Sequence, residues 1–71
     1  MINGKKLKML REAADMSASA LGEAVGVSQS MIANIEREFK TPSVGVLVRI
    51  ADILKVKIDD LIKRNNENDA K

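Results

Sequence analysis

Apolar residues recur along this chain at the spacing of amphipathic helices, with short polar breaks between the segments. Leu7, Leu10 and Ala14 stand three and four residues apart, and charged residues lie between them. This spacing places the three side chains on one stripe of a helix. The sequence therefore predicts a first helix over about Gly4 to Ala14, with its lysines on the outer side.

Serine residues mark the starts of the next two predicted helices. Ser17 precedes residues 18–25 and Ser28 precedes residues 29–37. A serine hydroxyl at such a position accepts a hydrogen bond from an amide that the helix leaves unpaired. Gly26 follows the first of these segments, as expected for a residue that ends a helix in the left-handed backbone conformation. The two short helices are therefore joined by a turn of three residues.

The segment after Thr41-Pro42-Ser43 is open between helix and strand. It is rich in valine and isoleucine, whose propensity favours a strand as much as a helix. The apolar residues nevertheless follow the helical spacing i, i+3, i+4 and i+7, at Leu47, Ile50, Ala51 and Leu54. We therefore expect a fourth helix.

A fifth helix is predicted over Val56 to Arg64, with Ile58, Leu61 and Ile62 facing inward. Residues 65–71 hold a single apolar residue, Ala70, and are expected to form a disordered polar tail. The chain is thus interpreted as one all-α domain of five helices over residues 1–64, followed by the tail at 65–71. No linker or internal repeat indicates a second domain.

Composition removes most catalytic and metal chemistry. The 71 residues include no cysteine and no histidine, which excludes disulfides, thiolate or imidazole nucleophiles and the common zinc sites. The sequence also lacks a glycine-rich phosphate loop and a pair of carboxylates in an evident cleft. We therefore expect no enzyme activity, no cofactor and no metal.

Charge is balanced overall but uneven along the chain. Twelve basic and ten acidic residues give a net charge of +2, and four basic residues precede the first acidic one: Lys5, Lys6, Lys8 and Arg11. This cluster is either a solvated face or a source of long-range attraction for nucleic acid. The longest apolar run, residues 44–48, is far shorter than the roughly 20 residues of a membrane span. Without a signal-peptide pattern, a cytoplasmic protein without a membrane partner is expected.

The outer face of the third helix, over about residues 28–37, carries unusual polar groups. Ile32, Ile35 and Met31 share its inner side, whereas the outer side and first turn hold Gln29, Ser30, Ala33 and Asn34. Ordinary solvated faces are richer in lysine and glutamate. Glutamine and asparagine can make paired hydrogen bonds to adenine, and serine can reach several bases. The face suits base reading in the major groove, and a polar surface without a partner is the alternative.

The same residues resemble the Cro/lambda-repressor-like, or Xre-type, helix-turn-helix family. The resemblance covers residues 4–62 and rests on the Gly-Val-Ser turn at 26–28, Ile35-Glu36, Pro42-Ser43 and the Asp-Asp-Leu run at 59–61. It implies a compact five-helix lambda-repressor-like domain that binds double-stranded DNA. Bases would be read at the positions of Gln29, Ser30, Ala33 and Asn34.

Further roles follow from this resemblance. It implies phosphate contacts from Ser17, Arg37 and Lys40, and the amides at a helix start make Ser28 suitable as well. Arg11 and Glu36 match a pair that bridges the first and third helices, which would be a structural role.

The sequence departs from the family pattern at four positions. Lys57 replaces the serine or threonine that usually caps the last helix, which is therefore expected to fray. Ala18 stands where a glutamine commonly contacts phosphate, so that contact should be missing. Glu38 stands where glycine is usual, and its carboxylate would repel phosphate unless it turns toward Arg37 or Lys40. Gly22 replaces an alanine and would allow the second and third helices to approach closely.

These features predict a small sequence-specific transcriptional regulator, in particular a repressor that occludes a promoter. Val46 and Ile53 lie seven residues apart beside the core stripe of the fourth helix, which suggests the contact of a homodimer. The competing interpretation is an antitoxin or an adaptor whose main role is to bind another protein. That alternative is favoured by three acidic residues expected to face outward, Glu38, Asp52 and Asp59, and by Ala18 in place of a phosphate contact.

Overall fold

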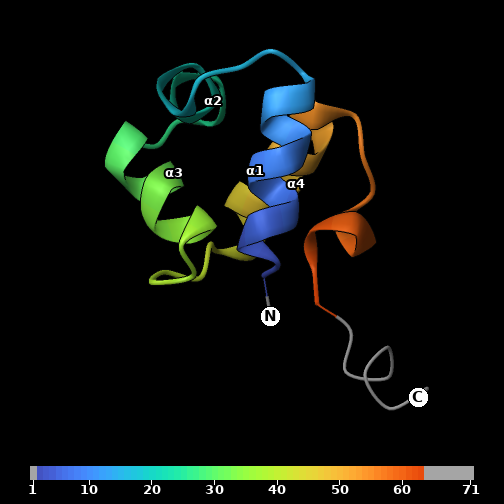
Figure 1. The fold of residues 1–71 in the computed structure, drawn as a ribbon. Coiled ribbons are helices and arrows are strands. Elements are labelled where there is room, and N and C mark those ends of the chain that lie inside the picture. The colour runs from blue at the N-terminus through green and yellow to red at the C-terminus, as the bar shows by residue number, and fades with distance from the viewer. Residues whose placement is uncertain (1, 64–71) are drawn as a thin grey trace, which may run out of the picture.

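The structure is a computed structural model, in which residues 2–63 are described (Figure 1). They form four α-helices and one short 3₁₀ helix: α1 (Gly4–Ala13), α2 (Ala18–Val25), α3 (Gln29–Glu36), α4 (Val44–Leu54) and η1 (Ile58–Leu61). The predicted bounds of the first three helices are correct to within one residue. No helix in residues 2–63 is long and apolar enough to cross a bilayer. The tail predicted at 65–71 lies outside the described residues.

Local hydrogen bonds explain where the four α-helices begin. At each start, a side-chain oxygen accepts from the backbone amide three residues later, at 2.9–3.2 Å. The capping residues are Asn3, Ser17, Ser28 and Ser43. Gly26 ends α2 with φ +85°, and its amide donates to the carbonyl of Gly22 at 2.8 Å. The expected roles of the serines and of this glycine are therefore confirmed.

The fifth predicted helix is wrong in both type and length. Residues 58–61 form a single 3₁₀ turn, in which Leu61 is fully buried and Ile58 is 36% exposed. The chain then turns extended at Ile62, which forms an antiparallel bridge with Ile2. The carbonyl of Leu61 accepts a hydrogen bond from the amide of Asn3 at 2.7 Å. Backbone groups that would have continued the helix are thus satisfied by the N-terminal segment instead.

The core is aliphatic and is shared by all five elements. α2 packs against α3 and α4, while α1 packs against α3 and η1. The buried side chains of the core are those of Ile2, Leu7, Leu21, Val25, Ile32, Ile35, Ile50, Ala51, Leu54 and Leu61. Leu10, Met31 and Leu47 are partly buried at its edge. Ala14, expected on the inner stripe, is exposed because α1 ends before it.

Two glycines allow close backbone contacts around α3. A Cβ at Gly4 would overlap the carbonyl oxygen of Glu36 and lie 2.7 Å from its carbonyl carbon. The first turn of α1 therefore abuts the last turn of α3. A Cβ at Gly22 would lie 2.7 Å from the carbonyl oxygen of Val27, in the turn before α3. The expected close approach at Gly22 is thus present, whereas nothing in the sequence pattern indicated the contact at Gly4.

A methyl group at Gly4 should therefore destabilise the fold. We expect Gly4→Ala to lower the free energy of unfolding by about 1–3 kcal/mol, because backbone atoms of α3 must move to accommodate it. Gly45→Ala is the control, since a Cβ there has no neighbour within 4 Å. That change should raise the free energy of unfolding by up to about 1 kcal/mol through helix propensity. Urea unfolding measures both, and equal effects of the two variants would contradict the tight contact.

Candidate nucleic-acid interface

α2, the turn Gly26-Val27-Ser28 and α3 form a helix-turn-helix. The turn is compact because the amides of Gly26 and Val27 both donate to the carbonyl of Gly22, each at 2.8 Å. Val27 is half-buried against the core. In Figure 1, α3 lies at the edge of the molecule with one side facing away from α1 and α4. This arrangement leaves the outer side of α3 open to a partner.

The structure brings the four predicted base-reading residues to that outer side. Gln29 and Ser30 are exposed in the first turn, and Ala33 and Asn34 are half-buried one turn later. The inner side of α3 is held by fully buried isoleucines in the core. The backbone carbonyl of Asn34 accepts from the amides of two residues in the loop after α3, at 2.8 and 3.3 Å. The polar face is therefore continuous with that loop.

Both predicted phosphate-binding serines are exposed N-caps. The hydroxyl oxygen of Ser17 accepts from the amide of Ala20 at 2.9 Å, and that of Ser28 accepts from Met31 at 3.0 Å. In each case the hydroxyl keeps a hydrogen that it can donate. The first amides of each helix also lack an intrahelical acceptor. Each helix start is therefore a set of hydrogen-bond donors suited to an anion.

The loop after α3 carries Arg37 and Lys40, both exposed. The guanidinium of Arg37 lies 4.4 Å from the centroid of the Phe39 ring, a cation–π contact that restricts its position. Phe39 is itself 67% exposed. No role was predicted for Phe39, although it is the only aromatic residue of the sequence and lies two residues after a predicted phosphate contact, which is a usable signal.

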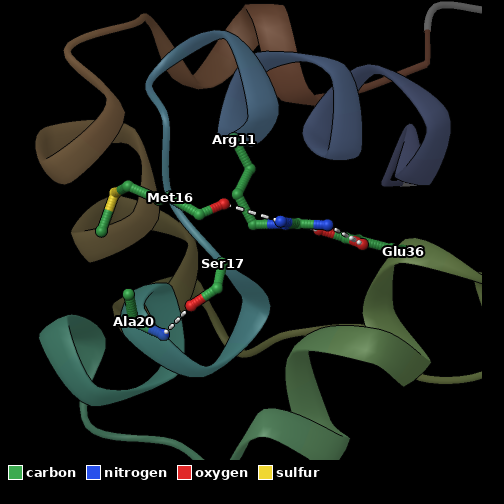
Figure 2. Close-up of polar contacts among 5 residues, drawn as sticks. All are labelled: Arg11, Met16, Ser17, Ala20 and Glu36. Atoms are coloured by element: carbon green, nitrogen blue, oxygen red, sulfur yellow. Dashed lines mark hydrogen bonds and ion pairs between the residues drawn. The ribbon is translucent and has the colours of Figure 1, made fainter.

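Arg11 links α1 to the segment just before α2 and to the end of α3 (Figure 2). Its Nε donates to Glu36 at 2.6 Å and its Nη2 to the other carboxylate oxygen at 3.2 Å. Its Nη1 donates to the carbonyl of Met16, just before α2, at 2.7 Å. The two charged side chains are only 10% and 8% exposed. The hydrogen bond to Glu36 raises the pKa of Arg11 above its ordinary value, against the opposing effect of burial.

Glu38 turns toward neither Arg37 nor Lys40, the two partners considered from the sequence, and pairs with other groups. Its carboxylate accepts from Lys63 Nζ at 2.7 Å and from the amide of Gly4, at the start of α1, at 3.0 Å. These two hydrogen bonds, Lys63 first, lower the pKa of Glu38 below its ordinary value. Glu38 has φ +64°, the left-handed conformation that favours glycine. The negative charge is therefore paired at the junction of α1 and the C-terminal segment.

The two residues predicted to form a dimer contact differ in exposure. Val46 is half-buried and packs against the core, whereas Ile53 is 38% exposed. Val44 and Val48, at 76% and 39%, are also exposed but lie on another side of α4. Only Ile53 of the predicted pair thus presents a large apolar surface.

Loss of one partner of the Arg11–Glu36 pair should be costly. Glu36→Gln leaves the Arg11 charge buried without a carboxylate, so we expect it to destabilise the domain by about 3 kcal/mol or more. Arg11→Met combined with Glu36→Leu removes both charges and should cost less than the sum of Arg11→Met and Glu36→Leu made separately. Urea unfolding of the set tests this expectation. Additive effects would show that the two side chains are not energetically coupled.

Comparisons with known proteins agree with this geometry. A family model described as helix-turn-helix matches residues 7–61. The chain is 31% identical over 67 residues to the HTH-type transcriptional regulator SinR of Bacillus subtilis, covering 93% of this chain and 60% of SinR. The chain spans smaller shares of some other relatives.

Solved structures show the same fold. The P22 c2 repressor in complex with a synthetic operator superimposes with a TM-score of 0.83 at 28% identity, over 89% of this chain and 96% of that one. SinR in its complex with SinI superimposes with a TM-score of 0.81 at 29% identity, over 94% of this chain and 66% of that one. On its helix-turn-helix geometry and these matches, the chain belongs to the Xre-type, lambda-repressor-like helix-turn-helix family of transcriptional regulators.

Proposed function

We propose that this protein represses transcription by binding specific double-stranded DNA sequences with α3 in the major groove. The observation that carries the proposal is the exposed amide and hydroxyl face of α3, bordered by two helix starts and a basic loop. The likeness to a repressor solved in complex with an operator supports it. Binding at a promoter would exclude the polymerase.

The proposed DNA contacts are of two classes, contacts to bases and contacts to phosphates. Gln29 and Ser30 are the most exposed groups of the face and would read base edges, with Ala33 and Asn34 beside them. Phosphates on either side would be bound at the two helix starts and in the loop after α3, by Ser17, Ser28, Arg37 and Lys40. Phosphate contacts position the protein on the duplex, and base contacts give it sequence preference.

We further propose that two copies bind together. One module of this size contacts a single half-site, and two copies related by a two-fold axis read a palindrome. Ile53 offers apolar surface for that contact, and the half-buried Val46 lies two turns away on the same side of α4.

The second candidate function is an antitoxin or adaptor whose main task is to bind another protein. It is favoured by one observation, the likeness of this chain to SinR in a complex with SinI. DNA selection separates the two candidates, because a module whose main partner is a protein need not prefer any duplex.

Selection of bound duplexes from a randomised library should enrich one palindrome at physiological salt. We expect half-site centres about 10 bp apart, the spacing of one helical turn, because two α3 helices must enter the groove on the same side of the duplex. Sedimentation should then find two protein chains per duplex. Weak, salt-labile binding without sequence preference would contradict the proposed function, and one chain per duplex would contradict the dimer.

Variants of α3 and its loop should separate base reading from phosphate binding. On the selected duplex, Gln29→Ala should relax base preference at one position and leave the salt dependence of binding unchanged. Arg37→Ala should weaken binding to all sequences alike and reduce the slope of log K against log salt by about one unit. Fluorescence anisotropy over a salt series measures both effects. The opposite pattern would refute the assignment of these two residues.

A further inference from the structure

An open groove of about 550 Å³ lies between α1 and the helix-turn-helix. α1 contributes Lys5 and Lys8, which stand three residues apart on one side of the helix. Ala18, the first residue of α2, and Ala33 and Arg37 from α3 and its end line the facing wall. Ala33 also lies on the predicted base-reading face. The groove therefore borders the surface that would meet DNA.

The carboxylates that line the groove are already paired. Glu36 accepts from Arg11 at 2.6 Å, and Glu38 accepts from Lys63 at 2.7 Å and from the Gly4 amide at 3.0 Å. Within residues 2–63, no ion pair engages the other three cations of the groove, Lys5, Lys8 and Arg37. The lining thus has a net positive charge, and its negative groups are held by other partners.

The start of α2 adds neutral hydrogen-bond donors to these charges. The side chain and carbonyl of Ser17 accept from the amides of Ala20 and Leu21, both at 2.9 Å. The amides of Ala18 and Ser19 precede them and have no acceptor within the helix. Ala18 carries only a methyl group, so its side chain does not fill the groove in front of this helix start. Lysines on one wall and helix-start amides on the other suit a single anion.

We propose that this groove binds a backbone phosphate of the DNA duplex, with Lys8 as the main contact from α1 and Lys5 beside it. The inference rests on the proposed function and adds α1 to the interface. A duplex phosphate is the occupant that fits, because Ala33 and Arg37 line the groove and Ser17 directly precedes its Ala18. All three residues are proposed to border the same duplex. Lys8 is the better probe of the two lysines, since the charge of Lys5 also acts on Glu38.

Lys6 provides a matched control within the same turn of helix. It lies about 100° around α1 from Lys5 and about 160° from Lys8. It does not line the groove but a second depression, with Asn3, Met9 and Lys5, and Lys5 is the one residue that the two share. Lys6→Ala and Lys8→Ala remove the same charge from the same helix. Long-range attraction to DNA therefore falls equally in both variants, and only Lys8→Ala removes a groove contact.

The test measures the affinity of each variant of the 71-residue chain for the selected duplex over a salt series. Lys8→Ala should weaken binding severalfold, without changing base preference, and reduce the slope of log K against log salt by about one unit. Lys8→Arg should keep the wild-type slope, and Lys6→Ala should leave it unchanged. Thermal unfolding of each variant without DNA verifies that these surface changes leave the fold intact.

Equal slopes for Lys8→Ala and Lys6→Ala would overturn the proposal. If Arg37→Ala still reduced the slope in that case, the proposed function would stand and only the groove contact would fail. If the wild-type protein showed no sequence preference at all, the proposed function would fail. A loss of slope confined to Lys8→Ala, measured on any duplex, would then still support a phosphate site in the groove.

Discussion

The buried contact between Arg11 and Glu36 is the constraint on which the proposed DNA-facing surface depends. Arg11 belongs to α1, Glu36 ends α3, and the carbonyl of Met16 that Arg11 also binds lies just before α2. Both side chains are about nine-tenths withdrawn from water, so neither charge can be left unpaired without a large cost. The pair therefore ties the orientation of the helix-turn-helix to α1. Gly4 reinforces the same junction by letting the two helix ends touch.

This junction also determines which charged groups are paired and which face the groove. The two carboxylates near the junction are both paired. Glu36 forms an ion pair with Arg11, and Glu38 forms one with Lys63 and accepts a hydrogen bond from the amide of Gly4. Cations on the outer side of α1 and at the end of α3 are left facing the groove. An acidic residue in the loop after α3 is thus compatible with a DNA-binding surface, because its charge is paired with the start of α1 and with Lys63.

Much of the fold followed from the sequence because its signals are local. Each serine cap acts on an amide only three residues away, and the left-handed turn at Gly26 needs no distant partner. The spacing of apolar residues identified the inner sides of α3 and α4 for the same reason, since helix geometry alone decides which side chains share a face. Once the inner side of α3 was identified, the remaining polar residues were predicted to lie on its outer side.

The sequence by itself thus determined the helix-turn-helix, its caps and the polar residues on the outer side of α3. The tertiary structure decided what depends on segments far apart in the chain. Ile62 pairs with Ile2 in place of a longer last helix, and Glu38 finds Lys63 and Gly4. The groove between α1 and the helix-turn-helix exists only because α1 packs against α3. Such contacts leave no periodic trace in a sequence, since backbone pairing and ion pairing depend on proximity in space and hardly on neighbouring residues.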